Sequence, residues 1–129
     1  MPDAKSKGLL LLDSVAGVDL QNGDGKTILY TVPPGKKAVI SHCVVRNPTA
    51  SLAGGTDFDF GDGANADTWK NTVNLSTMTA TTDYMVVDGS NAKYTIFDAG
   101  DAFGVKPVTG ATADAEATID VFGYEFDAA

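Results

Sequence analysis

The only histidine and the only cysteine in this chain, His42 and Cys43, are neighbours in the sequence. A thiolate beside an imidazole base can perform nucleophilic catalysis. Both residues fall in the apolar run 37–46, which we interpret as a strand, and consecutive strand residues point to opposite faces. We therefore expect a core cysteine and a hydrogen-bonded or interface histidine. The sequence also lacks a Gly-x-Ser-x-Gly elbow and a phosphate-binding loop, so we expect no enzymatic activity.

The densest group of polar side chains consists of Asp57, Asp59, Asp62, Asn65 and Asp67. Their oxygen atoms could bind Ca²⁺, and two nearby carboxylates could hydrolyse a glycoside. The spacing is not that of an EF-hand loop, the closing glutamate is missing, and no apolar pocket is evident that would raise a carboxyl pKa. A solvated strand face followed by a turn is the simpler interpretation. We expect no cofactor, with calcium at these five residues as the alternative.

Three aromatic side chains, Trp69, Tyr84 and Tyr124, could stack on sugars, as exposed aromatic rings of β-sandwiches often do. A lone tryptophan beside a glycine-rich turn more often fills a core. Glycan binding is therefore an alternative function.

Four consecutive leucines, Leu9, Leu10, Leu11 and Leu12, follow a polar N-terminal stretch. On a strand they must present apolar groups on both faces. They could form a first strand covered on both sides, or they could dock on a neighbouring subunit. The two interpretations are compatible, and we expect these leucines to belong to an interface.

Most of the chain consists of short β-prone runs between glycine-rich and Asp-Gly turns, which predicts an all-β fold. Alternation places Ile28, Tyr30 and Val32 on one face of their strand, and Phe58 and Phe60 on the inward face of another. The run 37–46 is apolar on both faces, which predicts a central strand covered on both sides. We expect about eight strands, at residues 8–12, 27–32, 37–46, 56–60, 84–87, 92–97, 101–108 and 116–126.

The uneven loops between these runs favour an antiparallel two-sheet sandwich of the jelly-roll type over a regular barrel. Residues 64–80 come nearest to a helical pattern, but they contain too many Thr and Asn residues for us to predict a helix. We expect residues 1–7 to be a flexible N-terminal arm and residues 8–129 to form a single β-sandwich domain.

The chain has a formal net charge of −8, and most of its acidic residues are aspartates, which favour turns. An acidic surface with Arg46 as the only arginine argues against nucleic acid and anionic membranes as partners. Four leucines are too few for a signal-peptide core, and no run reaches the length of a membrane span. We expect synthesis in the cytoplasm without a signal peptide.

One segment is similar to a known pattern. It begins at Tyr30-Thr31-Val32-Pro33-Pro34-Gly35-Lys36, continues through the long apolar strand and ends at Asn47-Pro48-Thr49. The later segment from Phe60-Gly61-Asp62-Gly63 to Trp69 adds to the likeness. Over roughly residues 28–126, the chain resembles small bacteriophage virion proteins.

This resemblance implies a head decoration (cement) protein, a jelly-roll knob that is often trimeric and binds over joints of the capsid lattice. Its partners would be the major capsid protein or another virion protein, and its location the capsid surface, after synthesis in the host. No residue motif carries over as a site; our expected contact is the Leu9–Leu12 run, with the aspartate-rich loops facing solvent. Tail- or tip-associated receptor- or glycan-binding modules have similar folds and are the alternative.

Overall fold

The computed structural model describes residues 8–89 and 95–128, which contain nine β-strands and no helix. The strands are β1 (Leu10–Asp19), β2 (Thr27–Thr31), β3 (Lys36–Arg46), β4 (Asp57–Gly61), β5 (Lys70–Val73), β6 (Tyr84–Asp88), β7 (Ile96–Asp98), β8 (Ala102–Thr109) and β9 (Glu116–Asp127). The expected arm at residues 1–7, the first half of the expected strand 92–97 and Ala129 lie outside the described residues. Within the described part of the chain, no helix is long and apolar enough to span a membrane.

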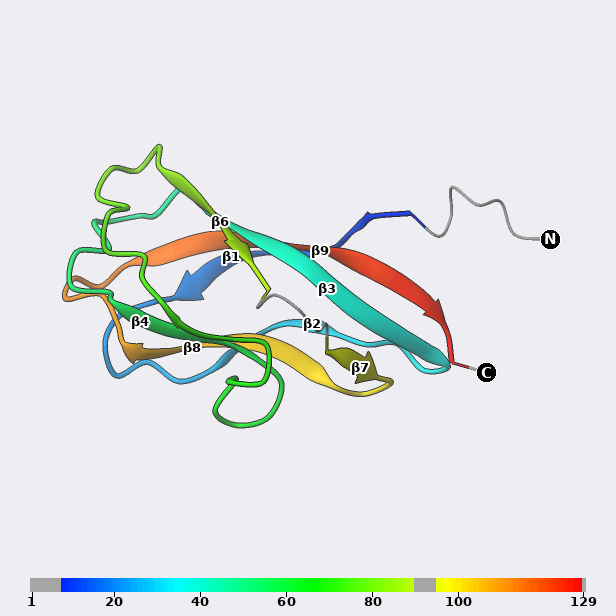
Figure 1. Cartoon of the computed structure of the whole chain (residues 1–129). Coiled ribbons are helices and arrows are strands. Elements are labelled where there is room, and N and C mark those ends of the chain that lie inside the picture. The colour runs from blue at the N-terminus through cyan, green and yellow to red at the C-terminus, as the bar shows by residue number, and fades with distance from the viewer. Residues whose placement is uncertain (1–7, 90–94, 129) are drawn as a thin grey trace.

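The strands form two antiparallel layers (Figure 1). The five-stranded sheet has the order β1-β9-β3-β6, with β7 also paired to β3; β6, β3 and β9 lie uppermost in the figure, and β7 is drawn lower. The four-stranded sheet has the order β2-β8-β4-β5. Because β6 and β7 pair with different parts of β3, at residues 42–46 and 37–39, they occupy one strand position. The chain passes repeatedly between the layers, as in a jelly roll, and the expected antiparallel sandwich is confirmed.

Aromatic rings fill the space between the sheets. Phe58 and Phe60 on β4 and Phe103 on β8 are fully buried, as the alternation predicts. The indole of Trp69 meets the Phe103 ring edge-on, with ring centroids 5.3 Å apart and planes at 84°. Each such contact contributes roughly 0.5–1.5 kcal/mol beyond the area that it buries. This cluster fixes the distance between the two sheets near the middle of the molecule.

A hydrogen bond joins the two sheets near one end of the sandwich. The Tyr30 hydroxyl on β2 donates to Glu125 Oε2 on β9 at 2.6 Å. Burial, followed by the bond to the carboxylate, raises the pKa of Tyr30, so the hydroxyl keeps its proton. This bond therefore persists at neutral pH.

Aspartates stabilise several of the turns. The carboxylates of Asp24, Asp83 and Asp101 each accept a hydrogen bond from a backbone N–H three residues earlier, at 2.8–3.0 Å. Aspartate is suited to this role because its short side chain reaches nearby backbone donors. The expected concentration of acidic residues in turns is confirmed for these three.

The expectation that β3 is covered on both faces is wrong. Its inward residues Ala38, Ile40, Cys43 and Val45 are fully buried, whereas the outward residues of the strand are only partly buried. Ser41 is an extra residue opposite the Gly123–Phe122 step of β9, since Ile40 pairs with Gly123 and His42 with Phe122. This β-bulge reverses the alternation midway along the strand.

Two further expectations differ from the structure. Ile28 is exposed, whereas Leu29, Tyr30 and Val32 are buried, because the pairing of β2 with β8 is irregular between Ile28 and Tyr30. In addition, β5, which lies within residues 64–80, was not expected from the sequence. That segment forms loops and a short edge strand, consistent with its content of Thr and Asn.

Candidate functional site

His42 and Cys43 lie on opposite faces of β3, as expected. The Cys43 side chain is fully buried between the sheets, and burial raises the pKa of its thiol. The His42 ring lies on the outer side of the five-stranded sheet, stacked on Phe122 with centroids 4.8 Å apart and planes at 13°. The two side chains therefore cannot act together as base and nucleophile.

The five candidate calcium ligands do not form a single cluster. Asp57 and Asp59 lie on the outer side of β4, where Asp59 accepts a hydrogen bond from the Thr72 N–H at 3.0 Å. Partial burial and the neighbouring Asp59 raise the pKa of Asp57, whose Oδ1 is enclosed and lacks a hydrogen-bond partner. Across residues 8–89 and 95–128, no three His, Cys, Asp or Glu side chains are close enough together to hold a metal ion.

The other three candidates lie beyond the end of β4. The Thr68 hydroxyl donates to Asp62 Oδ1 and accepts from the Asp62 N–H. Asn65 Oδ1 is 3.5 Å from Lys106 Nζ. Asp67 is exposed. The loop is thus held by the Asp62–Thr68 bonds within it and by the contact with Lys106 on β8.

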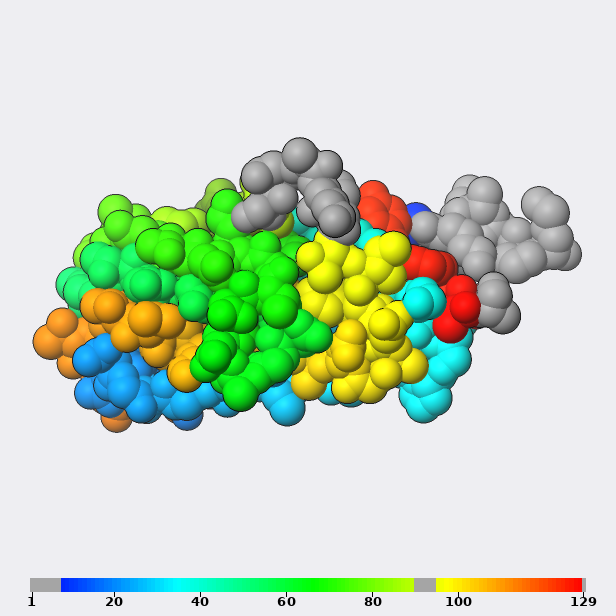
Figure 2. Space-filling model, turned by 60° about the horizontal axis from the view of Figure 1, so that its bottom comes forward, coloured from blue at the N-terminus to red at the C-terminus, as the bar shows by residue number. Residues whose placement is uncertain are grey.

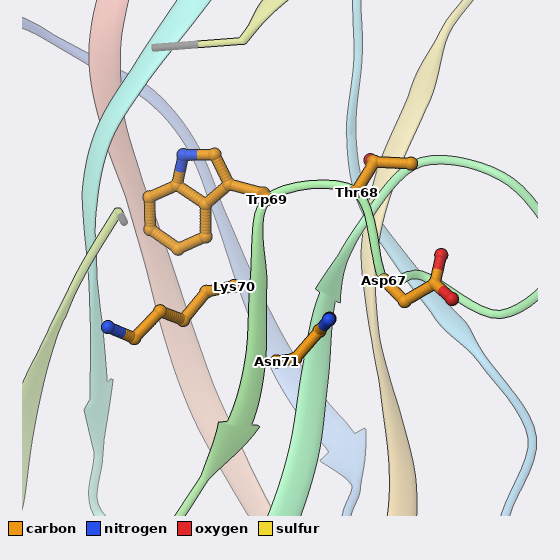
Figure 3. A pocket seen from close by; sticks show the side chains of 5 residues that line it. All are labelled: Asp67, Thr68, Trp69, Lys70 and Asn71. Carbon is orange, nitrogen blue, oxygen red and sulfur yellow. The ribbon is translucent and has the colours of Figure 1, made fainter. Parts of the chain in front are cut away.

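Trp69 fills the core and is not a sugar platform. Its indole N–H donates to the Ile40 carbonyl at 3.2 Å, and the side chain is almost fully buried. An open hollow of about 340 Å³ lies beside it, lined by residues 67–71 (Figure 3). In that view the side chains of Asp67 and Thr68 lie on the other side of the chain trace from Trp69 and Lys70. The lining side chains therefore do not converge on one point.

Tyr84 and Tyr124 are exposed, but they do not form a joint sugar platform either. They lie beside Arg46 and Val39 of β3, respectively, seven residues apart along that strand. At a rise of about 3.3 Å per residue, this separation is about 23 Å along the strand. Two rings so far apart cannot stack on one sugar unit.

Exposed apolar side chains gather on the outer side of the five-stranded sheet, hereafter the outer face. Its side chains are exposed or half-buried, and they come from all five strands. Cross-strand pairing brings them into rows: Leu11 lies beside Phe122, which lies beside His42, and Tyr124 lies beside Val39, which lies beside Ile96. Val44 and Val86 form a further pair. Such rows make one continuous surface.

The leucine run lies at the edge of this face. Leu9, Leu10 and Leu11 are exposed, whereas Leu12 is partly buried and packs against Gly123 on the inner side. Alternation from Leu11, which is opposite Phe122, places Leu9 on the same side of β1. The role of the four leucines as an interface stays a prediction.

The basic residues on and beside the outer face are each paired with an acidic one. Arg46 Nε donates to Asp120 Oδ2 at 2.9 Å, and the Ser14 hydroxyl donates to Asp120 Oδ1 at 2.6 Å. Lys37 binds Asp98 and, at the end of the sheet, Lys36 binds Asp127. Partial burial disfavours the charged form of Asp120, but the bonds from Arg46 and Ser14 outweigh it and lower the pKa of this carboxyl.

No protein-family profile and no curated protein matches this sequence. A solved structure does match the fold: a chain from the acid-stable capsid of Helicobacter pylori bacteriophage KHP30, with a TM-score of 0.50. The two chains are 11% identical, and the match covers 93% of this chain and 98% of the other. At this identity the likeness concerns the fold alone, along nearly the full length of both chains.

The outer face could not be identified from a single sequence segment. The apolar rows Phe122-Tyr124-Phe126 and Val39-Val44 are visible as second apolar sides of two strands. What the sequence does not reveal is that both sides belong to one sheet, whose outward surface is not covered by other described residues.

Proposed function

We propose that this chain is a structural protein of a bacteriophage virion, a decoration (cement) protein that binds the outside of the capsid lattice and has no catalytic activity. The observation that carries the proposal is the near-complete match of its fold to a chain of a phage capsid. The resemblance of residues 28–126 to small virion proteins supports it independently. The route would be synthesis in the host cytoplasm followed by attachment to the shell.

Such a protein stabilises a shell by burying apolar area across the joints between capsid subunits. A standard protein interface buries about 1,600 Å² in total. The exposed leucines at the start of β1, together with the segment that precedes them, are the elements that we assign to the capsid. Attachment as a closed homo-oligomer, with the trimer favoured by the resemblance, would add avidity because several weak contacts act together.

The outer side of the four-stranded sheet would then face solvent, since Asp57, Asp59 and Lys106 lie there. In Figure 2, which is turned so that the bottom of the view in Figure 1 comes forward, the green and yellow parts of the chain lie against each other. A polar outward surface keeps a decorated particle soluble.

The test is binding of the purified full chain to capsids of the encoding phage from which this protein is absent. We expect added density outside the shell by electron cryo-microscopy and greater resistance of the shell to heat. Absence of binding by the folded chain would contradict the proposed function.

A matched pair of variants tests the leucine contact. Leu11 and Ile28 are each 55% exposed, Leu11 on β1 and Ile28 on the four-stranded sheet. We expect Leu11→Asp to weaken capsid binding by about tenfold or more, because an unpaired carboxylate would be buried, and Ile28→Asp to leave it unchanged. Because Leu11 also borders the outer face beside Phe122, the loss is assigned to the leucine contact only when the mass of the variant in solution equals that of the unchanged chain. Equal effects of the two variants would show that the leucines are not the contact.

A further inference from the structure

The outer face is large enough to form a stable protein interface. It spans four strand positions and about ten residues of β3, which corresponds to about 19 by 30 Å, or about 600 Å² in projection. One partner in a standard interface contributes about 800 Å² of accessible surface. Part of this area is charged, since Arg46 and Asp120 lie within it, and its apolar part consists of the rows around Phe122, Tyr124 and Val44.

The charges on this face do not oppose contact with another acidic protein. Lys37 and Arg46 are neutralised by Asp98 and Asp120 within the same face. Asp88, beside His42, is at the β6 margin of the face. The centre of the face therefore offers few charges that a partner must neutralise, even though the chain has a net charge of −8.

The shape and chemistry of the face fit a second β-sheet. A twisted sheet packs well on another twisted sheet at about 10 Å, as the two layers within this molecule do. Other copies of this chain are present from synthesis onward, and each exposes the same apolar outer face to water. Contact between copies would remove this apolar surface from water before any capsid is met.

From these observations we propose that the outer face, centred on Val39, Phe122 and Tyr124, is the surface through which copies of this chain associate with one another. A two-fold pair would use the face twice, and a ring of three would place it against a different surface of the next copy. The inference rests on the homo-oligomer of the proposed function and adds to it the surface through which the copies meet; the two can fail separately, since copies could associate whether or not the chain binds a capsid.

The test is the mass of the full chain in solution, measured by sedimentation equilibrium over a wide range of concentrations. We expect a small multiple of the 13.3 kDa monomer. Val86 on β6 and Val108 on β8 are 51% and 50% exposed, one on each sheet. We expect Val86→Asp to weaken association by about tenfold or more, because the carboxylate would lose water in the interface, and Val108→Asp to leave it intact.

A second matched pair guards against a variant that does not fold. Ile96 on β7 is 54% exposed and Ile28 on β2 is 55% exposed. Circular dichroism and thermal melting establish that each variant is folded, and Ile96→Asp should then act as Val86→Asp does. A monomer at all concentrations would overturn the inference, as would an oligomer that resists both Val86→Asp and Ile96→Asp.

The outcome also separates this inference from the proposed function. A monomeric chain that binds capsids, and loses that binding in Val86→Asp, would assign the outer face to the capsid and reject association between copies. An oligomer that binds no capsid would support association between copies and contradict the proposed function.

Discussion

At the scale of single residues, Gly123 shows how closely β9 and β3 approach. A Cβ at this position would overlap the Val39 carbonyl oxygen and would lie 3.0 Å from Leu12 Cδ1. Only glycine fits because the backbone of β3 itself occupies the space.

We expect Gly123→Ala to lower the free energy of unfolding by about 1–3 kcal/mol, the usual cost of overpacking. Urea denaturation measures this change in the free energy of unfolding. Gly25→Ala is the control, since a Cβ at Gly25 meets nothing within 4 Å and its φ is not positive. Equal stability of the two variants would show that β9 can move away from β3.

Two carboxylates face each other across β1 and β9, where Asp19 pairs with Glu116. A hydrogen bond to Asp19 and its charge raise the pKa of Glu116. A carboxyl whose pKa is higher in the folded state binds its proton more tightly there, so folding gains stability as the pH falls through that value.

We therefore expect Glu116→Gln to raise the melting temperature slightly at pH 7, and to raise it less at about pH 4, where the glutamate is largely protonated. Asp88→Asn controls for the loss of one negative charge elsewhere. A benefit of Glu116→Gln that is the same at both pH values would argue against repulsion from Asp19.

At the scale of elements, the Ser41 bulge decides which side chains of β3 form the outer face. Before the bulge Ala38 and Ile40 point inward, and after it Cys43 and Val45 do. Without the extra residue, one of these pairs would have to face solvent, because a one-residue shift reverses every side chain.

Deletion of Ser41 should therefore cost about 4 kcal/mol or more, the cost of exposing two core side chains and disturbing their packing. Ser41→Ala keeps the length of the strand and loses only the 3.2 Å contact with His42, so we expect a small effect. Comparison of the two unfolding curves in urea tests this. A stable deletion variant would mean that the register of β3 can shift.

The inward faces that the sequence predicted correctly belong to strands with a regular alternation of apolar residues, such as β4 and β9. Phe58 and Phe60 on β4, and Ala117, Ile119 and Val121 on β9, are inward as expected. β5 was missed because Lys-Asn-Thr-Val carries no such alternation, and Thr72 within it has a positive φ. It is held by pairing with β4 and by Asp59, which are contacts between distant residues.

The candidate site was predictable only in part. The Leu9–Leu12 run is a local signal, and three of its leucines are exposed. The outer face combines residues from positions 11 to 126, which only the strand order brings together. The bulges that select the outward residues depend on cross-strand pairing, which a single sequence does not encode locally.

At the scale of the whole molecule, the two outer sides of the sandwich differ in polarity. One presents the apolar outer face, and the other presents Asp57, Asp59 and Lys106. Ile28 and Val108 are exposed on the second side as well, so the difference between the two sides is one of degree, and burial of the outer face removes the larger set of exposed apolar side chains from water.

Association through the outer face should strengthen with salt. Each copy has a net charge of −8, and this repulsion is screened beyond about 8–10 Å near physiological ionic strength. We expect the dissociation constant to fall as NaCl rises from about 0.01 M to about 0.15 M. Sedimentation equilibrium at both concentrations measures it. Weaker association at the higher concentration would indicate ion pairs between copies.

The fully buried Cys43 has a practical consequence. A thiol-alkylating reagent reaches its sulfur only when the sheets separate, so the rate of modification counts openings of the native protein. Because the chain holds a single cysteine, each molecule reacts once, and the time course of modification reports on this one site. Comparison of the alkylation rate in dilute and concentrated samples would show how much association between copies slows the opening of the sandwich.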